Sequence, residues 1–291
     1  MTEVDARFLS GRILPREKES HKGDYGHLLL VCGCQSMPGA AVLSTGAALK
    51  SGCGLVTLHS TPRALQAAAI RYPSAILSED PGHHVSCIPS CLDKYAAVAA
   101  GPGLGQAPET LAALSDLLSR ARDAGIPVVL DADALNLVAA HPELFGLIPP
   151  DSVLTPHPGE LRRLLPQASE DEREAAVRAL CRKTACIVLV KGFRTHIYTP
   201  EGECFVNTTG NPGMAKGGSG DVLTGLIGGL VARGYRTLDA TLLGAWIHGY
   251  AGDCLTEECT AEAYDSGDLI ESLYRGFKEL SDYSCRRTAS R

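Results

Sequence analysis

Short apolar runs alternate with helical patterns along most of the chain. The runs 28–33, 55–59 and 187–190 are nearly continuous in apolar residues, which is typical of central parallel strands that are buried on both faces. Between the runs, apolar residues recur every three to four positions, as on the buried side of a helix. The pattern predicts a single α/β domain over residues 1–291, with a mostly parallel sheet and helices on both of its faces.

The expected elements follow this rhythm in chain order. Strands are expected at 28–33, 55–59, 96–100, 128–130, 152–155 and 187–190, and a hairpin at 195–199 and 203–206. Helices are expected up to about residue 20 and at 40–51, 110–124, around 175–180, from about 220, and at 238–254. The tail from about Ser281 is expected to be frayed.

A glycine-rich stretch, 207–225, precedes the pattern of a buried helix that starts at Val222. Gly217, Gly218, Ser219 and Gly220 should therefore lie at a helix N-terminus, where free N–H groups and the helix dipole form a cradle for an anion. Asp221 places a carboxylate beside this cradle, which suggests phosphoryl transfer to a hydroxyl with Asp221 accepting the proton. The alternative is a loop that ends in an N-capping aspartate.

Five strands are followed by polar or glycine-rich segments. These segments are 33–39, 101–105, 131–136, 156–160 and 191–192. Ligands of open α/β sheets bind outside the carboxyl ends of the strands. The five segments and the anion cradle are therefore predicted to form an active site at one edge of the sheet.

Several of these residues also have a purely structural interpretation. One of Asp131 and Asp133 is expected to make an Asx-turn, and His157, between two prolines, either caps its loop or contacts a ligand. Glu160 either begins a helix or orders the waters of a Mg²⁺ ion. Lys191 either contacts a phosphate or lies on the surface.

Three further polar residues are interpreted in the same way. Asn136 is expected to fix the backbone rather than touch a ligand. Lys216 either adds positive charge to the cradle or points to solvent. His248 lies in an apolar helical pattern with Trp246, and both are expected to be packed side chains.

Composition narrows the class of protein. The net charge of −6 and the absence of long basic runs argue against a nucleic-acid binder. No apolar stretch approaches the length of a membrane span, and the N-terminus lacks a signal-peptide pattern. The eleven cysteines are scattered without metal-site spacing, which predicts a cytoplasmic protein without a structural metal. The chain also lacks the glycine fingerprint of a hydride-transfer Rossmann site.

Five segments together resemble the NAD(P)H-hydrate dehydratases of the ribokinase-like superfamily. They occur in the order of that family and are Lys22–Gly26, Gly101–Gly105, Asp131–Asn136, Thr155–Glu160 and Asn207–Gly225. The resemblance spans roughly residues 20–275 and leaves no room for the epimerase domain that is fused to some members. It implies a ribokinase-like fold and a homo-oligomer, specifically a tetramer, that works with a separate epimerase.

The resemblance also implies a metabolite-repair reaction. Hydrated NADH or NADPH carries a hydroxyl at C6 of its nicotinamide ring, and the family acts on the S form. ADP phosphorylates this hydroxyl with Mg²⁺ as cofactor, phosphate then leaves, and the reduced cofactor, AMP and phosphate result. The form of 211–221 is similar to the prokaryotic branch of the family, which uses ADP rather than ATP.

The same resemblance implies roles for individual residues. Asp221 is the catalytic base, and the N–H groups of Gly218, Ser219 and Gly220 form an anion hole. The hydrate is contacted by Ala40, Gly103, His157 and Asp221. The adenine nucleotide is held by Lys191, Gly192, Phe193, Arg194, Thr195 and Gly220. Glu160 acts on Mg²⁺ through water, because His157 stands where related vitamin kinases have the asparagine of their magnesium motif. Lys216 replaces a small residue of many relatives.

Two other functions stay open. A kinase for a vitamin precursor would share the fold, the cradle and the base, and would release a stable phosphoester. A non-catalytic nucleotide-binding regulator would need no base, so Asp221 argues against it. The preference between hydrated NADH and hydrated NADPH is also open at this point.

Overall fold

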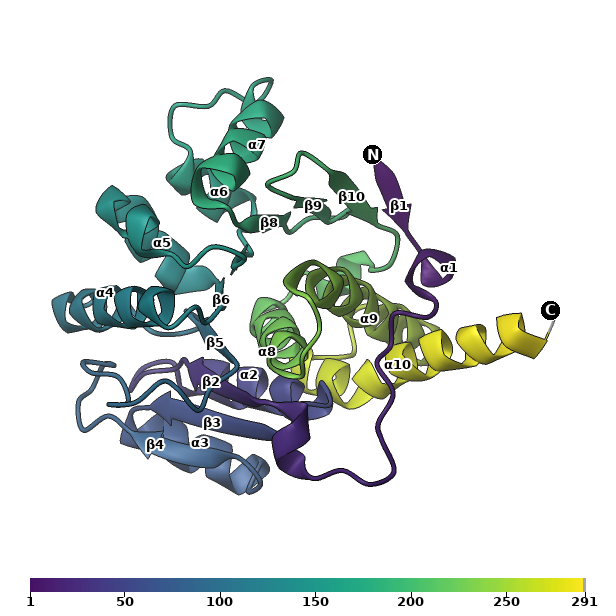
Figure 1. Cartoon of the computed structure of the whole chain (residues 1–291), viewed down its shortest axis with the longest axis horizontal. Coiled ribbons are helices and arrows are strands. Elements are labelled where there is room, and N and C mark those ends of the chain that lie inside the picture. Colours follow the sequence, from purple (N-terminus) through teal and green to yellow (C-terminus); the bar gives the residue numbers. More distant parts are fainter. Residues whose placement is uncertain (290–291) are drawn as a thin grey trace.

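A computed structural model describes residues 1–289 and contains one ten-stranded sheet, in the order β1-β10-β9-β8-β7-β6-β5-β2-β3-β4 (Figure 1). Neighbouring strands are parallel except at β9, which runs antiparallel to both β8 and β10. The predicted α/β class with a mostly parallel sheet is therefore confirmed. The strands are β1 Thr2–Val4, β2 His27–Val31, β3 Leu55–Ser60, β4 Ile76–Glu79, β5 Ala97–Ala100, β6 Val128–Leu130, β7 Val153–Leu154, β8 Ile187–Val190, β9 His196–Tyr198 and β10 Cys204–Asn207.

Helices cover both faces of the sheet, and each face has its own apolar core. Helices α4 to α7 lie on one face, whereas α2, α3, α8, α9 and α10 lie on the other (Figure 1). The α-helices are α1 Ala6–Leu9, α2 Pro38–Lys50, α3 Pro62–Arg71, α4 Pro108–Asp123, α5 Ala132–Ala140, α6 Pro158–Leu164, α7 Arg173–Thr184, α8 Ser219–Ala232, α9 Thr237–Glu258 and α10 Ser266–Ala289. Short 3₁₀ helices occupy Lys22–Tyr25, Pro142–Leu147 and Pro212–Met214.

The continuous apolar runs result from burial on both faces of the sheet. In β2, Leu28 and Leu30 belong to the core beneath α8, while Leu29 and Val31 belong to the core beneath α4 and α5. Successive side chains of a strand point to opposite faces, so a strand between two helical layers needs apolar residues at every position. Burying each leucine stabilises the fold by about 1.5–3 kcal/mol.

Glycines allow α8 to lie unusually close to its neighbours. A Cβ atom at Gly225 would lie 2.1 Å from the carbonyl oxygen of Ser44 in α2, and one at Gly228 would lie 2.8 Å from Cβ of Ala99 in β5. A side chain at either position would force the two elements apart. The small residues therefore fix where the N-terminus of α8 sits relative to the sheet.

Three expectations about the elements were wrong or incomplete. The predicted N-terminal helix is limited to α1, because residues 2–4 pair with β10 as a parallel edge strand and Gly11 adopts a φ of 85°. The elements α3, β4, α5 and α10 were not predicted. The tail from Ser281 is not frayed but belongs to α10 through Ala289, and the preceding Leu280 is fully buried. None of the helices within residues 1–289 has the length and apolar character to cross a membrane.

Candidate active site

The predicted polar segments meet at the carboxyl edge of the sheet. Backbone hydrogen bonds join segments that are distant in the sequence: the N–H of Gly33 donates to the carbonyl of Pro102 at 2.8 Å, and that of Lys191 donates to the carbonyl of Pro156 at 2.9 Å. The start of α8 faces the same edge, since a Cβ atom at Gly220 would lie 3.3 Å from Nζ of Lys191 and 3.4 Å from Oδ2 of Asp131. The structure therefore brings the segments together as expected.

The N-terminus of α8 presents free N–H groups. Gly218 is the N-cap with a φ of 91°, and a Cβ atom there would lie 2.4 Å from Leu43. The N–H of Ser219 donates to the carbonyl of Lys216 over a long 3.4 Å, whereas those of Gly218 and Gly220 have no acceptor among residues 1–289. Such groups at the positive end of a helix dipole are suited to binding an anion.

Asp221 lies in the first turn of α8 and does not cap it. The N-cap is Gly218, and the carboxylate of Asp221 makes no hydrogen bond or ion pair with any other described residue. The alternative of an N-capping aspartate is therefore wrong. Burial, and then the charge of Asp131, raise the pKa of Asp221 to about 6, while Lys191 opposes this rise. A half-buried, unpaired carboxylate of this pKa is well suited to accept a proton near neutral pH.

Asp131 anchors Lys191 and α8 beside Asp221. Its Oδ1 lies 2.6 Å from Nζ of Lys191, and its Oδ2 accepts a hydrogen bond from Oγ1 of Thr224 at 2.7 Å. Asp131 is 1% exposed, so the ion pair is shielded from water. The surface interpretation of Lys191 is wrong, and Asp131 makes no Asx-turn.

Asp133 stabilises the loop that follows β5. Its Oδ2 accepts from the N–H of Gly105 at 2.8 Å, and its Oδ1 accepts from Nε2 of Gln106 at 3.2 Å. The expectation of an Asx-turn is therefore wrong for both aspartates, because each of them bonds to a distant segment. Asn136 was expected to fix the backbone; its Oδ1 instead accepts from Nε of Arg163 at 2.9 Å.

His157 and Glu160 together cap α6. Nδ1 of His157 accepts from the N–H of Gly159 at 2.9 Å, and Oε2 of Glu160 accepts from the N–H of His157 at 2.8 Å, which is a reciprocal capping box. Nε2 of His157 also lies 3.2 Å from Oε1 of Glu160. Both structural interpretations are thus confirmed. Nζ of Lys191 lies 3.8 Å from Oε2 of Glu160, so this buried carboxylate still faces the site.

The other predicted site residues fall into two groups. Ala40 and Gly103 are neighbours, because a Cβ atom at Gly103 would lie 2.7 Å from Cβ of Ala40. In the segment 191–195, only Lys191 reaches the centre of the site. Phe193 is 80% exposed, and Nη1 of Arg194 lies 3.6 Å from Glu3 of β1. These two side chains lie at the rim, beyond the end of β8.

Sequence reasoning missed the contacts that hold the cradle in place. His248 is packed as expected, but its Nε2 lies 3.0 Å from the carbonyl oxygen of Ser219. Burial lowers the pKa of His248 to about 4, so the ring is neutral and donates to that carbonyl. Trp246 is buried in the core, as predicted. The repeated apolar spacing of α9 gave no signal that His248 touches α8.

Lys216 and Ser266 tie the same loop to the connection between α9 and α10. Nζ of Lys216 donates to the carbonyls of Ala261, Glu262 and Tyr264 at 2.8, 3.1 and 2.6 Å. Oγ of Ser266 donates to the carbonyl of Gly217 at 2.9 Å. Lys216 therefore neither adds its charge to the cradle nor points to solvent. The two partners in each of these hydrogen bonds are about 45 residues apart in the chain. Local sequence patterns therefore did not predict these contacts.

The chain is similar to known proteins over most of its length. The sequence model of the NAD(P)H-hydrate dehydratase family matches residues 28–275. A bifunctional NAD(P)H-hydrate repair enzyme of Moorella thermoacetica is 40% identical over 96% of this chain and 54% of its own length. An ADP-dependent (S)-NAD(P)H-hydrate dehydratase of Neisseria meningitidis is 38% identical over 83% of this chain and 81% of its own length.

Solved structures show the same similarity. A crystal structure of an ADP/ATP-dependent NAD(P)H-hydrate dehydratase of Bacillus subtilis, co-crystallised with ATP and Mg²⁺, superposes with a TM-score of 0.83 at 29% identity, covering 96% of this chain and 98% of that one. The chain spans about half the length of the bifunctional relatives it matches. The match to the family model and the similarity to single-function relatives along nearly their whole length lead to one conclusion: the chain belongs to the NAD(P)H-hydrate dehydratase family.

Proposed function

We propose that the protein restores NADH and NADPH from the S form of their C6-hydrated derivatives, with ADP as phosphoryl donor. The observation that carries this proposal is Asp221, a half-buried carboxylate without a partner, with its pKa raised to about 6, beside two free N–H groups at a helix N-terminus. This arrangement combines a base with an anion cradle. Family membership supports the choice of a hydrated nicotinamide ring as the acceptor.

The reaction proceeds in two stages. The C6 oxygen attacks the terminal phosphorus of ADP and gives its proton to Asp221, while the bond to the leaving AMP oxygen breaks. The N–H groups of Gly218, Ser219 and Gly220 stabilise charge on the transferred group. The C6–O bond then breaks, pushed by the lone pair of the ring nitrogen, and a proton leaves the neighbouring ring carbon. Phosphate departs because it is a far better leaving group than hydroxide.

The surrounding residues divide into two binding regions. Ala40, Gly103 and His157, which follow β2, β5 and β7, contact the hydrated ring and its ribose. Lys191, Gly192, Phe193, Arg194 and Thr195, which follow β8, hold the adenine nucleotide together with Gly220. Lys191 is positioned for a phosphate contact because its Nζ lies next to the first turn of α8.

Mg²⁺ fits this edge of the sheet as an ion held through water. Both oxygens of Glu160 already contact His157, and Asp131 is bound to Lys191 and Thr224. Neither carboxylate is free to ligate a metal directly, but Glu160 can orient metal-bound waters, which Mg²⁺ usually keeps. The ion would neutralise charge on the phosphates of the donor.

We further propose that the chain acts as a single ribokinase-like domain in the cytoplasm, assembles as a homotetramer and works beside a separate epimerase. ADP rather than ATP is the donor, as the name of the Neisseria meningitidis relative states for that protein. The Bacillus subtilis relative is named as ADP/ATP-dependent, so parallel assays with ADP and with ATP test this choice of donor.

Product analysis tests the proposal. Protein, Mg²⁺, ADP and hydrated NADH are incubated, and NADH, AMP and inorganic phosphate are quantified by chromatography and a phosphate assay. We expect the three products in a 1:1:1 ratio. A stable phosphoester without inorganic phosphate would indicate a vitamin-type kinase. Nucleotide binding without any product would indicate a regulator.

A further inference from the structure

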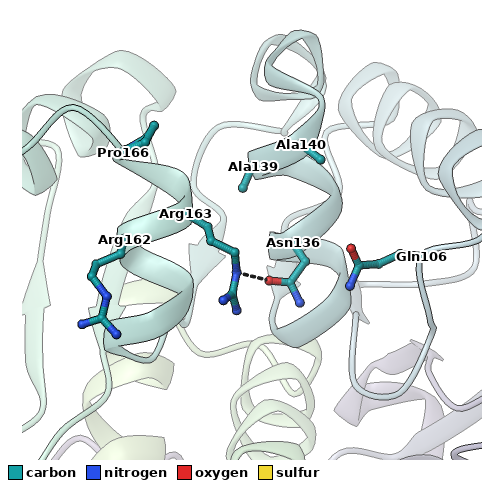
Figure 2. Close-up of a pocket in the computed structure, with 7 residues that line it drawn as sticks. All are labelled: Gln106, Asn136, Ala139, Ala140, Arg162, Arg163 and Pro166. Carbon is teal, nitrogen blue, oxygen red and sulfur yellow. Dashed lines mark hydrogen bonds between the residues drawn. The ribbon is translucent and has the colours of Figure 1, made fainter.

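A pocket outside the candidate active site does not have Asp221 in its lining. It has a volume of about 700 Å³ and lies between the loop after β5, helix α5 and helix α6. Its polar lining consists of Gln106, Asn136, Arg162 and Arg163 (Figure 2). Figure 2 shows the Arg163 side chain between α6 and α5, with Asn136 beside it and Gln106 beyond Asn136. We refer to this cavity as the arginine pocket.

The two arginines of this pocket have unused hydrogen-bond donors. Arg163 donates through Nε to Oδ1 of Asn136 at 2.9 Å, and its two terminal nitrogens have no partner among the described residues. Arg162 makes no hydrogen bond or ion pair within that same part of the chain. Elsewhere many arginines pair with carboxylates, as Arg120 does with Asp116 and Arg178 with Glu174. Two guanidinium groups without a carboxylate partner among the described residues therefore line the pocket, and Figure 2 shows them on different sides of α6.

The arginine pocket is connected to the candidate active site through Asp133. Oδ1 of Asp133 accepts from Gln106 at 3.2 Å and from Asn136 at 3.4 Å, and its Oδ2 accepts from the N–H of Gly105 at 2.8 Å. The charge of Asp133 also contributes to the raised pKa of Asp221. Asp133 thus links two lining residues of the pocket to the loop that contains Gly103.

The position of the pocket favours one of the two proposed ligands. Gln106 follows Gly103 by three residues, and Arg162 follows the capping residue His157 by five residues. The pocket therefore lies over β5, β6 and β7, on the side proposed for the hydrate, whereas the proposed nucleotide segment follows β8. Its polar side chains are mostly exposed, which places it at the outer end of the site, away from Asp221.

We propose that the arginine pocket binds the 2′-phosphate on the adenosine of hydrated NADPH, so that the protein prefers hydrated NADPH to hydrated NADH. This inference rests on the proposed function. A phosphomonoester carries close to two negative charges. A planar guanidinium can donate two parallel hydrogen bonds to two of its oxygen atoms. The adenosine lies at the far end of the dinucleotide from the nicotinamide ring, which matches a pocket at the outer end of the site.

Steady-state kinetics with both hydrates test this assignment. We expect Arg162→Ala and Arg163→Ala each to raise KM for hydrated NADPH about tenfold, the loss of one charge-assisted hydrogen bond. The KM values for hydrated NADH and for ADP should change less than twofold. Arg162→Glu should have a larger effect than Arg162→Ala, because it adds a repulsive charge.

Arg182→Ala is the matched control. Arg182 is an exposed helical arginine in the last turn of α7, at the opposite edge of the sheet from the site. The Arg182→Ala substitution should leave the KM values for both hydrates unchanged. An equal rise of KM for both hydrates would place the pyrophosphate in the pocket and overturn the assignment. A rise of KM for ADP, or unchanged values in all variants, would overturn it as well.

Direct binding separates this inference from the proposed reaction. Calorimetric titration with adenosine 2′,5′-bisphosphate and with adenosine 5′-monophosphate, each with ADP at a saturating concentration so that the proposed nucleotide segment is occupied, needs no turnover. We expect the bisphosphate to bind at least tenfold more tightly, and the difference to vanish in a doubly substituted Arg162→Ala, Arg163→Ala protein. Equal affinities in the wild type would refute the pocket assignment even if both hydrates are repaired. Absence of repair with the affinity difference intact would refute the reaction alone.

Discussion

At the scale of single residues, burial and the neighbouring charges determine whether Asp221 is ionised. Burial raises the pKa of Asp221, the proposed proton acceptor; the charge of Asp131 raises it further and Lys191 lowers it. Lys191 is held by the buried carboxylate of Asp131 at 2.6 Å, so its position is set by the sheet rather than by a ligand. This arrangement keeps Asp221 mostly ionised at neutral pH and still basic enough to take a proton from a hydroxyl.

The pH dependence of turnover should report the pKa of Asp221. Because the base must be ionised, we expect kcat/KM for the hydrate to fall about tenfold per pH unit below about 6, the pKa given by burial and Asp131. The pH profile of kcat/KM at saturating ADP measures this. An unchanged rate down to pH 4.5 would remove Asp221 from the role of base.

Asp221 should also reduce the stability of the fold at neutral pH. Its folded pKa lies above the unfolded value of 3.8, so the stability contributed by the protonated form is present below about pH 4 and is lost as pH rises through about 6. Asp221→Asn should therefore raise the free energy of unfolding at pH 7 by about 1–3 kcal/mol. Urea denaturation at pH 7 and at pH 4 measures this, and the gain should disappear at pH 4.

Replacing Lys191 should affect both stability and pH dependence. Lys191→Met leaves Asp131 buried without a counter-charge, which should cost about 3 kcal/mol of unfolding free energy. The pKa of Asp221 should rise, because its one attractive charge is gone. The acid limb of the pH profile should then move to higher pH. A variant that loses stability while its pH profile stays in place would show that Lys191 does not tune Asp221.

At the scale of elements, α8 carries the cradle, and its neighbours determine its position. Gly225 lets it approach α2, Thr224 bonds to Asp131, and His248 of α9 holds the carbonyl of Ser219. The glycine-rich start and the apolar spacing of this helix predicted its N-terminus correctly. The contacts of His248 and Lys216 could not be predicted, because they depend on how α9 and the α9–α10 connection fold back.

Two edge strands were also missed, because they depend on contacts with other parts of the sheet rather than on a local pattern. β1 is a three-residue edge strand that exists by pairing with β10, and β4 is a half-exposed edge strand with little apolar contrast. Neither has a local pattern strong enough to predict it. The central strands were predicted well because burial on two faces requires nearly every residue to be apolar.

Adding a methyl group to α8 should displace the cradle. Gly225→Ala places Cβ against the carbonyl of Ser44, and such overpacking should cost about 1–3 kcal/mol of unfolding free energy. ADP should also bind more weakly, which calorimetry measures. Gly146→Ala is the control, since a Cβ atom there meets nothing within 4 Å. Normal ADP affinity in Gly225→Ala would show that the cradle tolerates a shift of α8.

At the scale of the whole molecule, one sheet edge collects groups from both halves of the chain. The proposed hydrate side consists of the loops after β2, β5 and β7, and the proposed nucleotide side consists of the loop after β8 and the start of α8. The two helical layers hold these loops from opposite faces of the sheet (Figure 1). The resemblance in five separate segments was informative because the topology brings at least four of them to this edge.

The most direct test of the account is the recovery of reduced-nicotinamide absorbance at about 340 nm. Wild-type protein and Asp221→Asn are mixed with Mg²⁺, ADP and hydrated NADH, and ADP binding to both is measured in parallel. We predict that absorbance rises with the wild type and stays flat with Asp221→Asn, although both bind ADP. No rise with wild-type protein that binds ADP, or an undiminished rise with Asp221→Asn, would contradict the account.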